Sequence, residues 1–218
     1  MRKSVVYLGV LCLVLLTHTA SAQPYAFGFS NFTSGNYLDI NGTPYYNTDS
    51  GWVTNTGVHD GGNQNYYSGY GQCGVYCANF FSFNLATLDP GVTSASFTLD
   101  AYSVTNPGTF DIYGTALTPA EVDSAFSYTN PAIYNGIVDA PVIGSLMIGP
   151  GNSYTDITVG LNGAGLAWLN ANAGGSVVVG GAYEPPAPVP EPGALMLFAT
   201  TLVGIAGTAL RRRKRAMR

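Results

Sequence analysis

Ala95-Ser-Phe-Thr-Leu-Asp-Ala101 alternates apolar and polar side chains without a break. A period of two places the two sets on opposite faces of an extended chain, so this stretch predicts a half-buried β-strand. Similar alternation or a short apolar run marks five further strands, at residues 81–85, 110–113, 142–148, 155–159 and 176–183. Residues 142–148 are apolar nearly throughout, which favours a strand in the middle of a sheet.

Turn signals separate these strands at residues 89–91, 106–108, 149–151 and 174–175. Thr118-Pro-Ala-Glu121 is a capping box with Pro at the first helical position, so it predicts a short helix from Pro119 to about Phe126. A second helix is expected over Leu161–Asn172, since Leu161, Gly165, Trp168 and Leu169 fall near one face. Many short strands between Gly and Pro turns favour an all-β, two-sheet sandwich with two short helices.

Residues 23–79 differ from residues 80–183 in being dense in Gly, Asn and Tyr, with weak alternation. Ala26–Phe32 and Trp52–Val58 are candidate edge strands, and long surface loops are expected elsewhere in this part. The whole of 23–183 is expected to be one domain, loop-rich at 23–79 and regular at 80–183.

Charge is sharply segregated along the 218 residues. All 8 basic residues lie in the first three or last eight positions, and residues 23–190 contain eleven acids and no Lys or Arg. A nucleic-acid groove needs cations to neutralise phosphates, so nucleic acid is excluded as a partner. Anionic substrates would likewise lack an Arg fork. The composition is that of an acidic extracellular surface.

The first 22 residues have the three parts of a secretory signal peptide. Arg2 and Lys3 are followed by an apolar run, Val5–Leu16, and by the small residues Ala20-Ser-Ala22. Signal peptidase is therefore an expected partner, with cleavage between Ala22 and Gln23. The alternative is an uncleaved anchor, but the run of about twelve residues is short for a membrane span.

The last 35 residues also divide into three parts. Residues 184–192 are rich in Pro, which is incompatible with helix or central strand and predicts an extended spacer. Residues 193–210 carry no charge and would span about 27 Å as a transmembrane helix. The basic tail, 211–218, then holds the C-terminus in the cytoplasm through Arg211, Arg212, Arg213, Lys214 and Arg215.

Val189-Pro-Glu-Pro192, a single span and an Arg cluster in this order resemble the PEP-CTERM sorting signal. The resemblance covers about the last thirty residues and makes Pro190, Glu191 and Pro192 the recognition motif. It implies export from a bacterium that makes exopolysaccharide, and processing by an exosortase, a membrane Cys peptidase-transferase. The expected route is an inner-membrane intermediate with its domain in the periplasm, then the cell surface, biofilm matrix or medium. An ordinary single-pass anchor is the alternative.

A looser resemblance concerns residues 80–183. A strand pair, a later Asp156-Ile-Thr-Val159 strand, a helix with Trp168 and a final Gly-rich strand occur in the order of jelly-roll domains of the carbohydrate-binding-module type. This implies a jelly-roll-like fold, and no ligand-binding motif accompanies it.

Cys73 and Cys77 form an even pair in the exported part of the chain, which predicts a disulfide closing a small loop. A metal or redox pair is the alternative, but it would need more ligands than the single mature His59 can add. Calcium could be held by Asp60, Asn63 and Asn65, although no regular calcium loop is present.

Candidate catalytic groups are few. His59 and Asp60 could belong to a catalytic triad only with a nucleophilic Ser. The sequence contains no Gly-x-Ser-x-Gly nucleophile elbow, so a triad is not expected. Glycoside hydrolysis needs only two carboxylates, and Asp100, Asp111 and Asp156 could supply them, but each falls on the polar face of an expected strand. We therefore expect no enzyme and no catalytic, metal or cofactor site.

Tyrosines gather in the loop-rich part beside Asn and Asp side chains, a combination that sugar-binding sites use. Trp52, Tyr66, Tyr67 and Tyr70 are the candidate glycan contacts, and structural tyrosines are the alternative. The leading hypothesis is a non-enzymatic envelope or matrix protein linked to exopolysaccharide. A carbohydrate-binding module is the second hypothesis, and a polysaccharide hydrolase the third.

Overall fold

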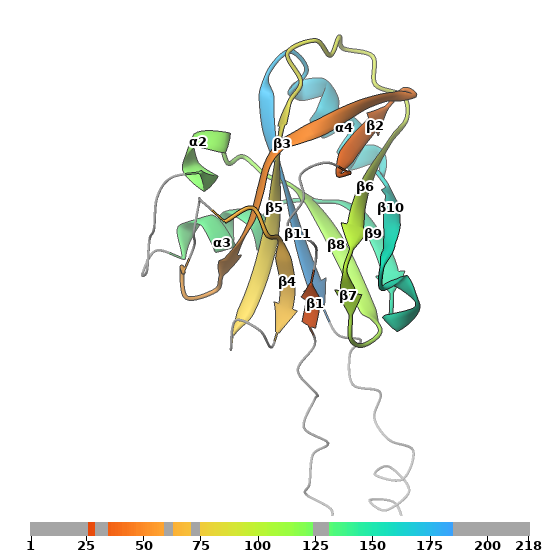
Figure 1. The fold of residues 1–218 in the computed structure, drawn as a ribbon. Coiled ribbons are helices and arrows are strands. Elements are labelled where there is room, and N and C mark those ends of the chain that lie inside the picture. The colour runs from red at the N-terminus through yellow and green to blue at the C-terminus, as the bar shows by residue number, and fades with distance from the viewer. Residues whose placement is uncertain (1–25, 29–34, 59–62, 71–74, 124–130, 185–218) are drawn as a thin grey trace, which may run out of the picture. The chain divides into compact units, whose positions relative to one another are not determined.

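The structure is a computed structural model of the chain that describes residues 26–28, 35–58, 63–70, 75–123 and 131–184 (Figure 1). The strands are β1 (Ala26–Gly28), β2 (Tyr37–Ile40), β3 (Thr43–Thr54), β4 (Tyr67–Tyr70), β5 (Tyr76–Asn84), β6 (Ala95–Ala101), β7 (Ser103–Val104), β8 (Gly108–Gly114), β9 (Val142–Ile148), β10 (Thr155–Gly160) and β11 (Ser176–Glu184). The helices are α2 (Pro119–Val122), α3 (Ala132–Val138), the 3-10 turn η1 (Pro150–Asn152) and α4 (Gly163–Ala171). The prediction of an all-β fold is confirmed.

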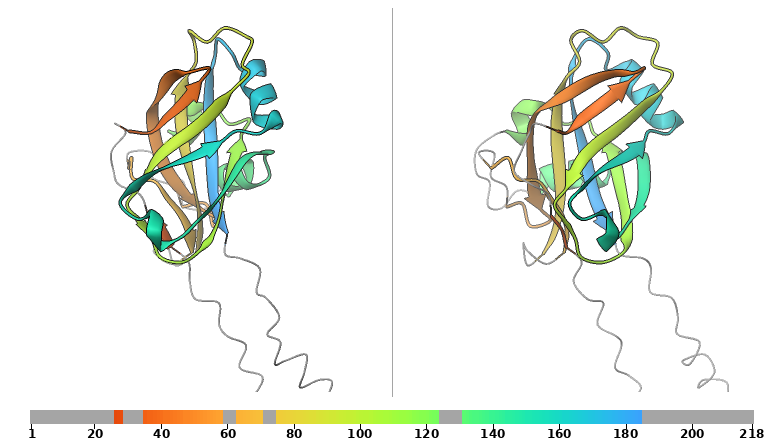
Figure 2. Two further views of the ribbon diagram at one scale, coloured as in Figure 1. Left: turned by 90° about the vertical axis from the view of Figure 1, so that its right-hand side faces the viewer. Right: turned by 45° about the vertical axis from the view of Figure 1, so that its right-hand side comes forward.

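All strand pairs are antiparallel and belong to one sheet with the order β10-β6-β2-β3-β5-β11-β8-β9. The short strands β1, β4 and β7 branch from this path, with β4 pairing to β5. The sheet curls until its two halves face each other, which brings the end strands β9 and β10 together (Figure 2). The expected two separate sheets are therefore two halves of one continuous, nearly closed sheet.

The curl turns at β3, the longest strand. Its first residues pair with β2, and residues from Asn47 onward pair with β5, with a bulge between Asn47 and Asp49. A bulge adds local bend and twist to a strand. One strand can therefore serve both halves, which we call the open half (β2, β6 and β10) and the covered half (β5, β11 and β8).

The main core lies between the two halves. Phe81 contacts Tyr66 and Phe97 with ring centroids 4.8 Å apart in both pairs, both edge-on. Edge-on contacts are a favoured geometry for aromatic rings and fill space densely. Leu38 from β2, Phe110 from β8 and other side chains from both halves complete this core.

A second apolar layer lies on the outer face of the covered half. Phe80, Val178 and Ala182 point outward there and pack against Val122 and Ile137 of helices α2 and α3. Strands β5 and β11 are consequently buried on both faces over their central seven residues. No helix of the described residues packs on the corresponding outer face of the open half.

Several elements differ from the expectations. Helix α2 has the predicted capping box but ends at Val122, and α4 begins at Gly163 behind an Asn162 cap. Strand β9, expected in the middle of a sheet, is the last strand of the order, and its Met147 is 63% exposed. The region 35–58 is more regular than expected, because it contains β2 and all twelve residues of β3.

Candidate binding site

A pocket open to solvent lies where β5 begins and β11 ends, beside helix α3. Its volume is about 530 Å³. Its lining consists of Tyr76, Cys77, Tyr134, Val138, Ala182, Tyr183 and Glu184. Tyr76 and Tyr134 are not buried and Glu184 is an exposed carboxylate, so the pocket offers two aromatic rings with a charged acceptor beside them.

The β-sheet alternation explains which side chains reach the pocket. Ala182 is opposite Ala78 in the β5–β11 register, and both side chains belong to the outer layer under α3. Tyr76 precedes Ala78 by two residues, and Glu184 follows Ala182 by two residues. Both side chains therefore point to the same outer face of the sheet. Helix α3 supplies Tyr134 and Val138 from above this face, since residues four apart share one side of a helix.

Ionisable groups near the pocket affect one another. Burial raises the pKa of Tyr134, and the Glu184 carboxylate raises it further, followed by Tyr76 and Asp139. The neighbouring Tyr113 is more deeply buried, and burial first, with Asp111 and Glu184 next, raises its pKa to about 12. Both phenols therefore keep their protons at neutral pH and can act as hydrogen-bond donors.

The pocket continues outward over an exposed pair of rings. Tyr70 at the end of β4 is opposite Tyr76 at the start of β5, and their ring centroids lie 5.2 Å apart. Tyr70 is 37% exposed and Tyr76 48% exposed. The aromatic surface thus extends from the pocket across the β4–β5 pair.

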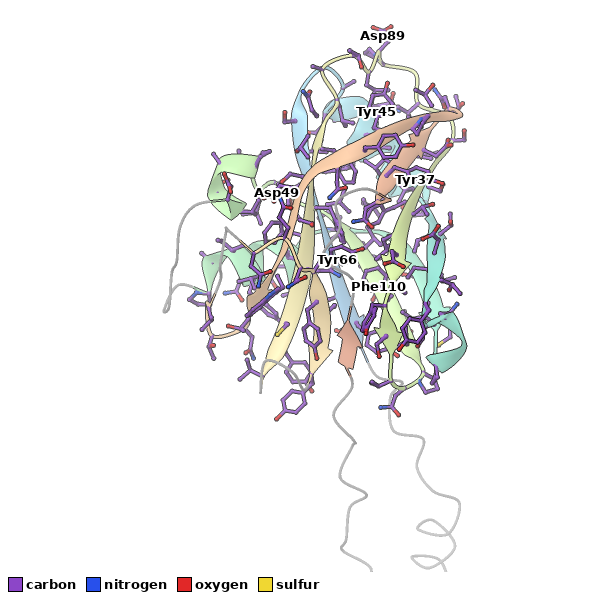
Figure 3. All side chains as sticks on the ribbon, in the orientation of Figure 1. Tyr37, Tyr45, Asp49, Tyr66, Asp89 and Phe110 are labelled. Atoms are coloured by element: carbon purple, nitrogen blue, oxygen red, sulfur yellow. The ribbon has the colours of Figure 1, made fainter. Side chains whose placement is uncertain are left out.

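Two of the expected glycan contacts lie in the interior instead. Tyr66 is 1% exposed, and its hydroxyl donates hydrogen bonds to Asn36 Oδ1 (2.9 Å) and to the Asp100 carbonyl (3.1 Å). Figure 3 shows this residue in the middle of the fold, between the two halves. Tyr67 is 5% exposed. Buried rings have no face to offer a sugar, so the expectation is corrected for these two residues.

Trp52 and Tyr70, the other two expected contacts, reach the surface in part. Trp52 lies on β3 opposite Asn79 of β5, and it is not among the residues of the pocket. Of the four expected residues, only Tyr70 therefore adjoins the pocket, through its ring contact with Tyr76.

The cysteine and calcium hypotheses are not decided by the structure. Cys77 lies buried on β5, while Cys73 is outside the described residues, so the disulfide stays a prediction. Asp60 and His59 are also outside the described residues. Asn63 Oδ1 accepts a hydrogen bond from the Asn65 amide, as in an Asx turn. In the described part of the chain no three His, Cys, Asp or Glu side chains group as metal ligands would.

The three carboxylates considered for hydrolysis lie on strands of both halves. Asp100 and Asp156 are directly opposite each other on the β6–β10 pair, while Asp111 on β8 accepts a hydrogen bond from Ser145. The Asp100–Asp156 pair lies on the outer face of the open half, and neither residue lines the pocket described above.

The sequence analysis missed Tyr76, Tyr134 and Glu184. Tyr76 lies between the two cysteines and was considered only as part of their loop. Tyr134 is on α3, a helix that the sequence did not predict. Glu184 was assigned to the spacer, whereas it is the last residue of β11. Alternation from Ala78 and Ala182 outward could have identified Tyr76 and Glu184 as neighbours.

Comparison with known proteins bears on the C-terminal part of the chain. The family model described as the PEP-CTERM protein-sorting motif matches residues 188–214. No curated protein and no solved structure matches the chain. The matched segment contains Pro190, Glu191 and Pro192, the predicted span 193–210 and the first basic residues of the tail.

The terminal segments lie outside the described residues. These include the signal peptide with its Ala22–Gln23 cleavage site, the span 193–210 and the tail 211–218. Within the described ranges, no helix has the length and apolar character needed to cross a membrane. The span, the signal peptide and the membrane-anchored intermediate stay predictions. The sorting motif itself is shown by the family match: residues 188–214 carry the PEP-CTERM protein-sorting motif, which is the signal of an exported protein and implies processing by an exosortase.

Proposed function

We propose that the protein is a non-enzymatic component of the cell envelope or extracellular matrix, associated there with exopolysaccharide. The observation that carries this proposal is the sorting motif at residues 188–214 on a chain whose residues 23–190 contain no Lys or Arg. The motif supports export, and the acidic, cation-free composition of residues 23–190 supports a well-hydrated surface. The predicted route passes through an inner-membrane intermediate and ends at the cell surface or in the medium.

Fractionation of tagged protein tests the sorting step. In cells that contain the exosortase, the wild type is expected as a shortened form in the surface or medium fraction. Glu191→Ala removes the acid of the motif and should leave the longer form in the membrane, as should loss of the exosortase. Glu184→Gln is a matched control, because it changes an acid seven positions earlier and should be processed normally. Normal processing of Glu191→Ala would contradict the proposal.

A second experiment tests the absence of catalysis. Purified protein incubated with the exopolysaccharide of the producing cells should remain bound to it in pull-down and release no new reducing ends. Released reducing ends would instead favour the hydrolase hypothesis, with Asp100 and Asp156 as its first candidates. Co-sedimentation equal to that of an unrelated acidic protein would argue against an association with the polymer.

A carbohydrate-binding module is the second candidate, and its support comes from the surface tyrosines. Each exposed Tyr of the described residues belongs to a ring pair: Tyr37–Tyr46, Tyr70–Tyr76 and Tyr102–Tyr154, with centroids 5.2 to 5.7 Å apart. Paired rings present rigid apolar surface, as sugar-binding sites require. The jelly-roll resemblance of residues 80–183 belongs to this candidate as well.

A further inference from the structure

The pocket of Tyr76, Tyr134 and Glu184 has the dimensions of a ligand site. Its volume of about 530 Å³ lies within the range of small-molecule sites, roughly 300–1,000 Å³. Because it is open to solvent, a polymer can enter with one unit and continue past the rim. The exposed Tyr70–Tyr76 ring pair lies along that rim and would contact the next part of the polymer.

The walls of the pocket favour a ligand with both apolar faces and hydroxyl groups. Tyr76 and Tyr134 approach from a strand and from a helix, so their positions are set by two different elements. Aromatic rings pack against the CH faces of sugars, and such rings lose little entropy on binding. Val138 and Ala182 add apolar surface between them.

The polar groups of the pocket complement sugar hydroxyls. The Glu184 carboxylate is an acceptor only, and it can receive two hydroxyl hydrogens at once. The phenol of Tyr134 stays protonated and can donate to a ring or hydroxyl oxygen, since burial and Glu184 both raise its pKa. Donor and acceptor are thus present in one small site, as a neutral polyol requires.

Charge decides which sugars can enter. Glu184 and Asp139 both influence Tyr134, so two carboxylates lie near the pocket. The exported domain has no Lys or Arg that could offset them. A uronate or sulfated unit would be repelled by these carboxylates and would find no cation to bind.

The geometry points to this pocket as a binding site for a neutral glycan, one unit of which is held between Tyr76 and Tyr134 with its hydroxyls on Glu184. This inference rests on the proposed association with exopolysaccharide and adds the site and the sugar class. The proposed glycan contacts therefore lie at the junction of β5, β11 and α3, in place of the contacts expected from the sequence at residues 52–70.

Binding to two fractions of one polymer tests the site. The full chain in detergent is run by affinity electrophoresis through gels that contain exopolysaccharide of the producing cells, separated by anion exchange into neutral and acidic fractions. The wild type should be retarded by the neutral fraction. Tyr76→Ala, Tyr134→Ala and Glu184→Gln should each weaken this binding by about tenfold or more, as loss of a central contact does.

Matched controls separate the pocket from general surface effects. Met147→Ala removes an exposed apolar side chain and Asp89→Asn an exposed carboxylate, both outside the pocket, and both variants should bind as the wild type does. Thermal unfolding of every variant identifies any that fails to fold. Because Glu184→Gln keeps size and shape at an exposed position, it tests the site even if an aromatic variant is destabilised.

Three outcomes would overturn the inference, and they differ in what they leave standing. If the pocket variants bind the neutral fraction as the wild type does, the site is wrong and the proposed function survives. Retardation by the acidic fraction alone would reject the sugar class and leave the association with exopolysaccharide. If the wild type binds neither fraction, both the site and the proposed function fail.

Discussion

The covered half and the open half of the sheet share one core but differ on their outer faces. In the covered half, Val178 and Phe80 point away from that core and are fully buried beneath α2 and α3. In the open half, the equivalent outward positions carry Thr158 and Asp156, which are exposed. The same kind of strand is therefore enclosed by protein on one side of the molecule and wetted on the other.

This difference shows what the second layer adds. Helix α3 fixes Tyr134 and Val138 above the strands, and the pocket forms where this layer meets the ends of β5 and β11. The open half has its own aromatic pair, Tyr37–Tyr46, but none of its strands contributes to this pocket. A concave site thus accompanies the helix-covered face.

The largest expected effect comes from filling a crowded position of the covered half. A Cβ at Gly181 of β11 would lie 2.2 Å from Asn79 Oδ1 and 2.7 Å from Phe110 Cζ, both in fully buried side chains. Gly181→Ala should therefore lower the free energy of unfolding by about 3 kcal/mol, the upper part of the range for overpacking. Urea unfolding of the purified domain measures it.

Gly160 of β10 is the matched control in the open half. A Cβ there would meet no atom within 4 Å, so Gly160→Ala should change the free energy of unfolding by under about 0.5 kcal/mol. Equal losses for the two variants would mean that the two halves do not differ in packing at these strands.

A polar group sharpens the comparison on the outer faces. Val53 of β3 is fully buried in the outer layer, so Val53→Thr places a hydroxyl among apolar side chains at nearly constant shape. We expect a loss of about 2 kcal/mol, the cost of desolvating an unpartnered hydroxyl. The reverse change, Thr158→Val, removes an exposed hydroxyl that is 2.8 Å from Thr98 Oγ1.

Because Thr158 is itself exposed, Thr158→Val should change the free energy of unfolding by under about 1 kcal/mol. Guanidinium unfolding of both variants at one pH measures the two effects together. A loss for Thr158→Val as large as that for Val53→Thr would show that the outer face of the open half is not wetted.

Individual strands also differ in how far the sequence predicted them. Strand β6 coincides with the predicted 95–101, because its alternation of apolar and polar residues is unbroken. Of strand β3 the sequence predicted only the residues from Trp52 onward, within the candidate edge strand Trp52–Val58, because Asn41-Gly42 was not interpreted as a hairpin turn. Both residues have positive φ, 52° and 81°, as a type I′ turn between β2 and β3 requires.

The candidate site was harder to predict, because it depends on a helix with weak sequence signals. Helix α3 follows the N-cap residue Pro131, contains Gly136 and has no side-chain cap. The glycine is explained only by tertiary packing, since a Cβ there would lie 3.0 Å from Leu117 Cδ2. Local propensity argues against such a helix, so Tyr134 could not be placed from the sequence.

The smallest expected effect concerns the cap of α2, on the covered half. The Glu121 carboxylate accepts hydrogen bonds from the Thr118 amide (2.7 Å) and the Thr118 hydroxyl (2.8 Å). The amide bond first, then the hydroxyl bond, lowers the pKa of Glu121 below its ordinary value. A lowered folded-state pKa adds stability that is complete above the unfolded pKa and is lost as the pH falls through the folded one.

Replacing Glu121 by Gln should remove this part of the pH dependence and leave the rest unchanged. The wild type and Glu121→Gln would be compared by urea unfolding between about pH 6 and pH 3, where carboxylates of this kind titrate. The difference in free energy of unfolding between the two proteins should be greatest at the upper end of this pH range and should shrink toward its lower end. Since Glu121 is exposed, added salt should also reduce this difference in the free energy of unfolding. A difference constant over this range would mean that the charge of Glu121 has no part in the cap. Helix α4, which is capped by the neutral Asn162, provides no such pH dependence and makes α2 the place to look for it.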